Sequence, residues 1–151
     1  MASKTTPTVA VMSIHPIFAA RILRGEKRVE FRKQRPRKEL SHILIYATAP
    51  TQQIVGYFEV VGIDEAHPRE IWSRFRKVGG IASKHFWAYY GKRTRAYAIR
   101  VGRVFRLPGP CTLHSVCGTT RPPQSFCYAR ALSLESVKRG VHQGRIAIAG
   151  Q

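Results

Sequence analysis

The chain has 151 residues, the size of one ordinary domain, and 44% of them are hydrophobic. This fraction excludes an intrinsically disordered chain and is sufficient for a hydrophobic core. The charge is strongly unbalanced, because 26 Lys and Arg residues stand against 8 Asp and Glu, which gives a formal net charge of +18. A charge of this size favours an anionic partner, either nucleic acid or a membrane surface.

The sequence favours nucleic acid over a membrane. It has no apolar run near the roughly 18 residues that span a bilayer, and its basic residues are spread over strands and turns instead of lining one amphipathic helix. RNA or a nucleotide is therefore the expected partner, although solubility alone would also account for a basic surface.

The cysteines and histidines predict neither a metal site nor another cofactor. Cys111, Cys117 and Cys127 contain no CxxC pair, and none of the six histidines has ligand spacing. The first eight residues lack the apolar stretch of a secretory signal. We therefore expect a cytoplasmic protein with reduced thiols.

The first predicted elements are a strand at 8–14, a helix beginning at Pro16, and a strand at 28–32. Proline suits the first helical position, because its missing N–H has no partner there. Gly25 is placed to end the helix in a left-handed conformation. In the second strand the apolar Val29 and Phe31 alternate with charged residues, so the two kinds are expected on opposite faces.

The middle and end of the chain predict further short elements. The nearly continuous apolar segment 41–48 indicates a buried strand, and 53–63 a second long strand in which Gly56 marks a bend or bulge. Helices are expected at 68–77 and 83–90, a long strand at 95–107, turns at 108–123 and a short helix at 133–139. This order predicts one α+β domain over 8–139, built around an antiparallel or mixed barrel, with a disordered segment at 1–7 and a tail at 140–151.

The strongest candidate site lies between the first helix and the second strand. Lys27 follows the helix-ending glycine, while Glu30 and Arg32 share one face of the strand. Lysine and arginine can bind a phosphate, and a carboxylate can accept hydrogen bonds from a base or sugar. From spacing alone, a surface ladder of ion pairs on an edge strand is the favoured interpretation.

These residues resemble the signature of the ASCH domain, which runs from a strand through a Pro-started helix to G-x-K-x-x-E-x-R. Gly25, Lys27, Glu30 and Arg32 occupy its four positions. The resemblance continues through 45–56, 71–99 and 122–128, and so covers roughly residues 8–130. It implies a PUA-like β-barrel of about five to six strands with short flanking helices.

The resemblance and the neighbouring segments together define the expected site. Residues expected to bind the ligand are Lys27, Glu30, Arg32, His15, Arg24, Thr48, Gln124, Ser125, Phe126 and Tyr128. Phe126 and Tyr128 would stack on an unpaired base, or they would instead cover the core. Asp64 or Glu65, expected just past a strand end, is a candidate partner base or a helix-capping acid. The expected basic surface comprises Lys33, Arg35, Arg37, Lys38, Arg74 and Arg95.

Two functions from different classes follow from the resemblance. Members of the family mostly bind RNA or act in regulation, which predicts recognition of single-stranded RNA or a modified nucleoside in a basic cleft. Other members are enzymes, so Lys27 and Glu30 are also candidate catalytic residues of a ribonuclease or an acetylcytidine-type amidohydrolase. The amidohydrolase branch has Thr where this chain has Glu30, which puts that chemistry in doubt. An acidic peptide is a third possible occupant of the cleft.

Overall fold

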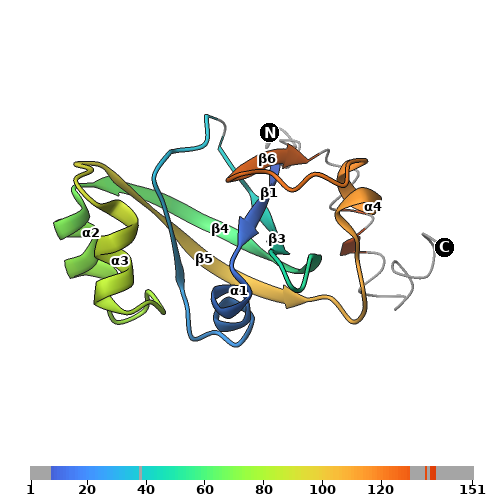
Figure 1. Cartoon of the computed structure of the whole chain (residues 1–151), viewed down its shortest axis with the longest axis horizontal. Helices are drawn as coiled ribbons and strands as arrows, with labels where there is room; N and C mark the ends of the chain where they lie inside the picture. The colour runs from blue at the N-terminus through green and yellow to red at the C-terminus, as the bar shows by residue number, and fades with distance from the viewer. Residues whose placement is uncertain (1–7, 38, 130–134, 136, 139–151) are drawn as a thin grey trace, which may run out of the picture.

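The computed structural model describes residues 8–37, 39–129, 135, 137 and 138 (Figure 1). In chain order its elements are β1 (Val9–Ile14), α1 (Pro16–Leu23), β2 (Val29–Arg32), β3 (His42–Ala47), β4 (Gln53–Ala66), α2 (Pro68–Phe75), α3 (Ser83–Tyr90), β5 (Ala96–Arg106), α4 (Leu113–Cys117) and β6 (Phe126–Ala129). Lys38, the segment 1–7, the tail 140–151 and most of the helix expected at 133–139 lie outside the described residues. No described helix is long and apolar enough to cross a membrane.

The strands form one mixed sheet in the order β2-β5-β4-β3-β1-β6. β1 and β3 pair in parallel, and the other neighbouring strands pair antiparallel. Figure 1 shows a long β4–β5 ribbon with α2 and α3 at one end and α4 and β6 toward the other. The sheet curls into a half-barrel with short flanking helices, which confirms the expected α+β, PUA-like fold.

The middle strands are buried on both faces. Ala10 and Met12 of β1 belong to a core cluster that includes side chains of α1. Val9 and Val11, on the opposite face of the same strand, belong to a second cluster that includes Leu113 of α4. Strands buried on both faces have continuous apolar sequences instead of an alternating pattern. A third cluster joins α2 and α3 to β2 and β5.

Two of the helices begin with the same His-Pro pair. The Nδ1 atoms of His15 and His67 accept hydrogen bonds from the backbone N–H groups of Ile17 and Arg69, at 3.2 and 3.1 Å. A proline follows each histidine at the first helical position, where it leaves no hydrogen bond unmade. These contacts give both histidines a structural role as helix caps.

The structure corrects the prediction in two places. β4 continues to Ala66, so Asp64 and Glu65 lie within the strand and not past its end. The segment expected to be turns contains α4, and the segment after it forms β6, which pairs with β1. A four-residue strand is too short to show periodicity, and its hydrogen bonds come from a distant part of the chain. The bulge expected at Gly56 is confirmed, because the β3–β4 register shifts beside it.

The Gly79–Gly80 turn packs directly on the side chain of Lys27. Gly80 has a φ of +60°, and a Cβ atom at this position would lie 2.6 Å from the Cβ of Lys27. A Cβ on Gly79 would lie 2.9 Å from the ring of Phe31. Any side chain here would push the turn away from Lys27, so glycine is needed for this close approach.

We predict that Gly80→Ala destabilises the protein more than Gly118→Ala does. Both positions have a left-handed φ, +60° and +70°, but nothing lies within 4 Å of a Cβ at Gly118. The free energy of unfolding of the Gly118→Ala control should fall by about 1 kcal/mol because of backbone strain. That of Gly80→Ala should fall by about 1–3 kcal/mol more because of steric overlap. Urea unfolding measures both; equal losses would contradict the packing of the turn on Lys27.

Candidate functional site

Lys27 is buried at the end of α1, with only 2% of its surface exposed. Its Nζ donates a hydrogen bond of 2.5 Å to the carbonyl oxygen of Gly79. The same nitrogen lies 5.2 and 4.9 Å from the ring centroids of Phe18 and Phe31, distances at which cations interact favourably with aromatic faces. Burial lowers the pKa of Lys27; the Glu30 carboxylate opposes this change and the Arg21 guanidinium adds to it.

Glu30 and Arg32 project from the same face of β2, as expected from their spacing. They are 7% and 9% exposed, and Nη1 of Arg32 lies 3.5 Å from Oε1 of Glu30. The other carboxylate oxygen, Oε2, and the Nε of Arg32 have no hydrogen-bond partner among the described residues. Leaving such groups buried without a partner costs free energy that a bound ligand would recover.

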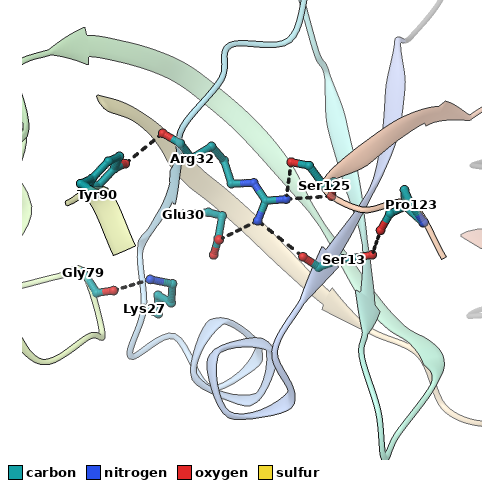
Figure 2. Close-up of polar contacts among 8 residues, drawn as sticks. All are labelled: Ser13, Lys27, Glu30, Arg32, Gly79, Tyr90, Pro123 and Ser125. Carbon is teal, nitrogen blue, oxygen red and sulfur yellow. Dashed lines mark hydrogen bonds and ion pairs between the residues drawn. The ribbon is translucent and has the colours of Figure 1, made fainter. Parts of the chain in front are cut away.

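The Arg32 guanidinium also connects β2 to the opposite side of the half-barrel. Its Nη2 donates to the carbonyl oxygen and the hydroxyl of Ser125, at 2.7 and 2.9 Å, and Nη1 lies 3.5 Å from the carbonyl oxygen of Ser13. The Tyr90 hydroxyl donates to the backbone carbonyl of Arg32 at 2.9 Å, and burial raises the pKa of Tyr90. Figure 2 shows the Arg32 side chain extending from β2 to Ser13 and Ser125 with Glu30 beside it, while Tyr90 lies on the other side of β2.

Ser13, Lys27, Glu30 and Arg32 line a cavity of about 440 Å³, within the usual size range of small-molecule sites. Its polar side is formed by Ser13, His15, Lys27, Glu30, Arg32 and His85. The remainder is aliphatic or aromatic and consists of Ile14, Ile17, Phe18, Phe31, Ile81, Phe86 and Tyr89. Flat apolar walls beside a few convergent polar groups are suited to an aromatic ring that carries hydrogen-bonding edges.

The structure thus brings four of the predicted ligand-binding residues, His15, Lys27, Glu30 and Arg32, to one cavity. Ser125 reaches its edge through the hydrogen bonds to Arg32.

The other five predicted residues do not line this cavity. Arg24 is exposed and pairs with Glu26 at 2.9 Å. The backbone N–H of Thr48 donates to Ile14. Gln124 is exposed. Phe126 packs against the first core cluster and contacts the ring of Tyr128.

Sequence reasoning missed the contribution of α3. His85 and Tyr89, spaced by four residues and therefore on one helical face, both line the cavity, together with Ile81 just before the helix and Phe86 within it. The helical spacing was visible in the sequence, but nothing in it indicated that α3 packs beside β2, more than fifty residues away in the chain.

The predicted basic surface is divided between several places. The Lys33 ammonium lies 4.4 Å from the centroid of the Tyr89 ring, at the cavity wall. Arg35 and Arg37 line a separate pocket of about 270 Å³. Arg74 pairs with Glu70 at 2.6 Å, and Arg95 lies 3.9 Å from Glu65.

The two acids that were candidate partner bases form ion pairs outside the cavity. Asp64 pairs with Arg100 at 3.0 Å, and Glu65 lies 3.9 Å from both Arg35 and Arg95. Neither lines the cavity. Among the described residues, no group of three or more His, Cys, Asp or Glu side chains could hold a metal ion.

Comparison with known proteins identifies the family. The chain is 30% identical over 124 residues to a Zymomonas mobilis protein named "ASCH domain-containing ribonuclease", a match that covers 80% of this chain and 84% of that protein. It is also 30% identical over 105 residues to a large ribosomal subunit protein of Ureaplasma parvum, where the match covers 70% of this chain but 33% of the relative. The crystal structure of ASCH from Zymomonas mobilis superposes with a TM-score of 0.77 at 28% identity, covering 84% of this chain and 91% of that one.

The sequence profile of the ASCH domain matches residues 12–105. This segment runs from β1 almost to the end of β5 and includes the buried Lys27, Glu30 and Arg32. The chain therefore belongs to the ASCH domain family.

Proposed function

We propose that this protein binds single-stranded RNA and holds one nucleoside of the strand in the cavity. The observation that carries the proposal is the buried carboxylate of Glu30, which lines an aromatic-walled cavity and whose Oε2 has no partner among the described residues. A nucleobase would stack on the aromatic walls and donate an N–H to this oxygen. Lys27 and Arg32 would donate to carbonyl, sugar or phosphate oxygens.

The distribution of charge supports an anionic polymer as the ligand. Glu26, Glu59, Asp64, Glu65 and Glu70 each contact an arginine. Exposed cations on and around α2 and α3 form no ion pair within the described part of the chain; they are Arg69, Arg76, Lys77, Lys84, Lys92 and Arg93. Because α3 also forms one wall of the cavity, a strand leaving the cavity along this helix would have cations within reach of its phosphates.

Glu30→Gln should weaken RNA binding, and Glu26→Gln should not. Both changes remove one negative charge, so simple attraction to phosphates would make either variant bind more tightly. Glu30 is 7% exposed in the cavity, whereas Glu26 is exposed and outside it. Losing a charged acceptor should raise the Kd of Glu30→Gln about tenfold or more.

Fluorescence anisotropy with a short labelled single-stranded RNA measures both Kd values. Tighter binding by both variants would show that the carboxylate accepts no hydrogen bond from the RNA and would contradict the cavity as the nucleoside site.

RNA affinity should also fall steeply as salt increases. Each phosphate neutralised on single-stranded RNA contributes a slope of about −0.7 to log K against log salt. If the cations around α3 contact several phosphates, titrations between low and moderate salt should give a slope of about −2 or steeper. A flat response would contradict a nucleic-acid ligand altogether.

RNA cleavage is a second candidate function, favoured by the ribonuclease name of the Zymomonas mobilis relative. Glu30 would accept the proton of a ribose 2′-hydroxyl as its oxygen attacks the adjacent phosphorus. The bond from phosphorus to the 5′-oxygen would break, and the leaving 5′-oxygen would take a proton from water. Lys27 or Arg32 would neutralise the charge that develops on the phosphate oxygens. Both groups line the same cavity as Glu30, which makes this division of roles geometrically consistent.

Lys27→Met separates the two functions, because methionine preserves the apolar packing of the stem but removes the charge. If the protein cleaves RNA, this change should abolish turnover, measured by gel analysis of labelled RNA. If the protein only binds RNA, Lys27→Met should bind RNA more weakly and with a smaller salt dependence. Neither the variant nor the unaltered protein should then form a cleavage product. Lys84→Met, at an exposed position of α3 outside the cavity, is the matched control: it loses one proposed phosphate contact, so it should bind RNA somewhat more weakly but retain any turnover at saturating RNA.

A further inference from the structure

The three cysteines, which the proposed function does not use, lie in and around α4 at the second core cluster. Cys111 precedes this helix, Cys117 ends it, and Cys127 lies in β6. All three belong to or pack against the second core cluster, and all three are free thiols. In β6 the side chains alternate, so Cys127 faces α4 while Phe126 packs on the other face of the sheet.

Two of the three thiols form a pair. The thiols of Cys117 and Cys127 are hydrogen-bonded to each other, and this bond lowers the pKa of Cys127 while it raises that of Cys117. Cys111 is different, because it is 2% exposed and its sulfur lies 3.7 Å from the Ser115 hydroxyl. Burial raises the pKa of Cys111. The thiolate, which is the reactive form, is therefore favoured at Cys127, with a second thiol beside it.

The segment between the paired cysteines, residues 118–125, contacts two residues that line the cavity, Ser13 and Arg32. The carbonyl oxygen of Pro123 accepts from the Ser13 hydroxyl at 2.7 Å. The carbonyl oxygen of Ser125 accepts from the backbone N–H of Ser13 at 3.0 Å and from Arg32 at 2.7 Å. A covalent bond between Cys117 and Cys127 would close this segment into a ring while it holds these contacts.

We propose that Cys117 and Cys127 are a redox-active pair that forms a reversible disulfide when it reacts with hydrogen peroxide. The Cys127 thiolate attacks one peroxide oxygen; the O–O bond breaks, hydroxide leaves, and a sulfenic acid remains. Cys117 then attacks this sulfur; the S–O bond breaks, and the hydroxyl group leaves as water with the thiol proton. The two sulfurs lose two electrons in total, and the peroxide gains them.

The disulfide should restrict the segment that holds Arg32. Closing a loop by a covalent bond removes conformational freedom from its open states. Local openings that separate Ser13 from Ser125 should therefore become rarer in the oxidised protein. Hydrogen exchange at the Ser13 amide, which donates to Ser125, should slow on oxidation and return to its original rate after reduction.

Peptide mapping of the full chain after treatment with hydrogen peroxide tests the assignment. Trypsin would leave all three cysteines on one peptide, because the bond after Arg121 precedes a proline. Chymotrypsin, which prefers large apolar side chains, separates them by cutting after Leu113 and Phe126. We expect one cross-linked species, joining the Cys117 and Cys127 peptides, that is lighter than the sum of the two by two hydrogen atoms and disappears on treatment with dithiothreitol.

Three variants complete the test. Cys111→Ser should form the same cross-link at the same rate as the unaltered protein, whereas Cys117→Ser and Cys127→Ser should form none. A cross-link to Cys111, or oxidation of all three thiols at equal rates without any cross-link, would overturn the proposal. So would an intermolecular disulfide on a non-reducing gel. Because the unaltered chain is itself oxidised and mapped, a variant that fails to fold leaves the result intact.

Discussion

The interaction on which the site depends is the set of hydrogen bonds made by the Arg32 guanidinium. β2 is at one edge of the curled sheet and β6 at the other, so backbone pairing does not join them. Arg32 spans this opening, because its side chain starts on β2 and donates to Ser125 just before β6. Arginine suits this position better than lysine, since its planar group offers several donors in fixed directions to acceptors on different segments. The same contacts hold Glu30 against a cation and leave its other carboxylate oxygen without a partner among the described residues.

Burial of Lys27 is the second constraint, and it accounts for the Gly79–Gly80 turn. An ammonium removed from water needs both a hydrogen-bond acceptor and favourable surroundings. The Gly79 carbonyl provides the acceptor, and the rings of Phe18 and Phe31 provide aromatic faces. The turn can approach this closely because neither glycine has a side chain. The position of α3, which follows the turn, is therefore linked to the position of the lysine.

Together these two constraints produce a cavity whose polar groups are fixed before any ligand enters. Pre-arranged groups bind with a smaller loss of conformational entropy than flexible ones. The aromatic walls come mainly from α1, β2 and α3, while six surface cations that have no ion pair among the described residues lie around α2 and α3. Under the proposed function, the cavity would bind one planar group, and the neighbouring cations would contact phosphates outside it. Cys117 and Cys127 flank the segment that Arg32 holds, so the proposed disulfide would restrict that segment at the edge of the cavity.

Much of this arrangement follows from local sequence. The helix start at Pro16, the glycine that ends α1 and the alternation in β2 are enough to predict that Lys27, Glu30 and Arg32 lie close together, because helix caps and strand faces depend on neighbouring residues. The sequence by itself also determined the net charge and the ASCH motif. Only the tertiary structure decided that these residues are buried, that α3 supplies a cavity wall and that β6 pairs with β1. Those features depend on contacts between segments far apart in the chain, and local periodicity carries no information about such partners.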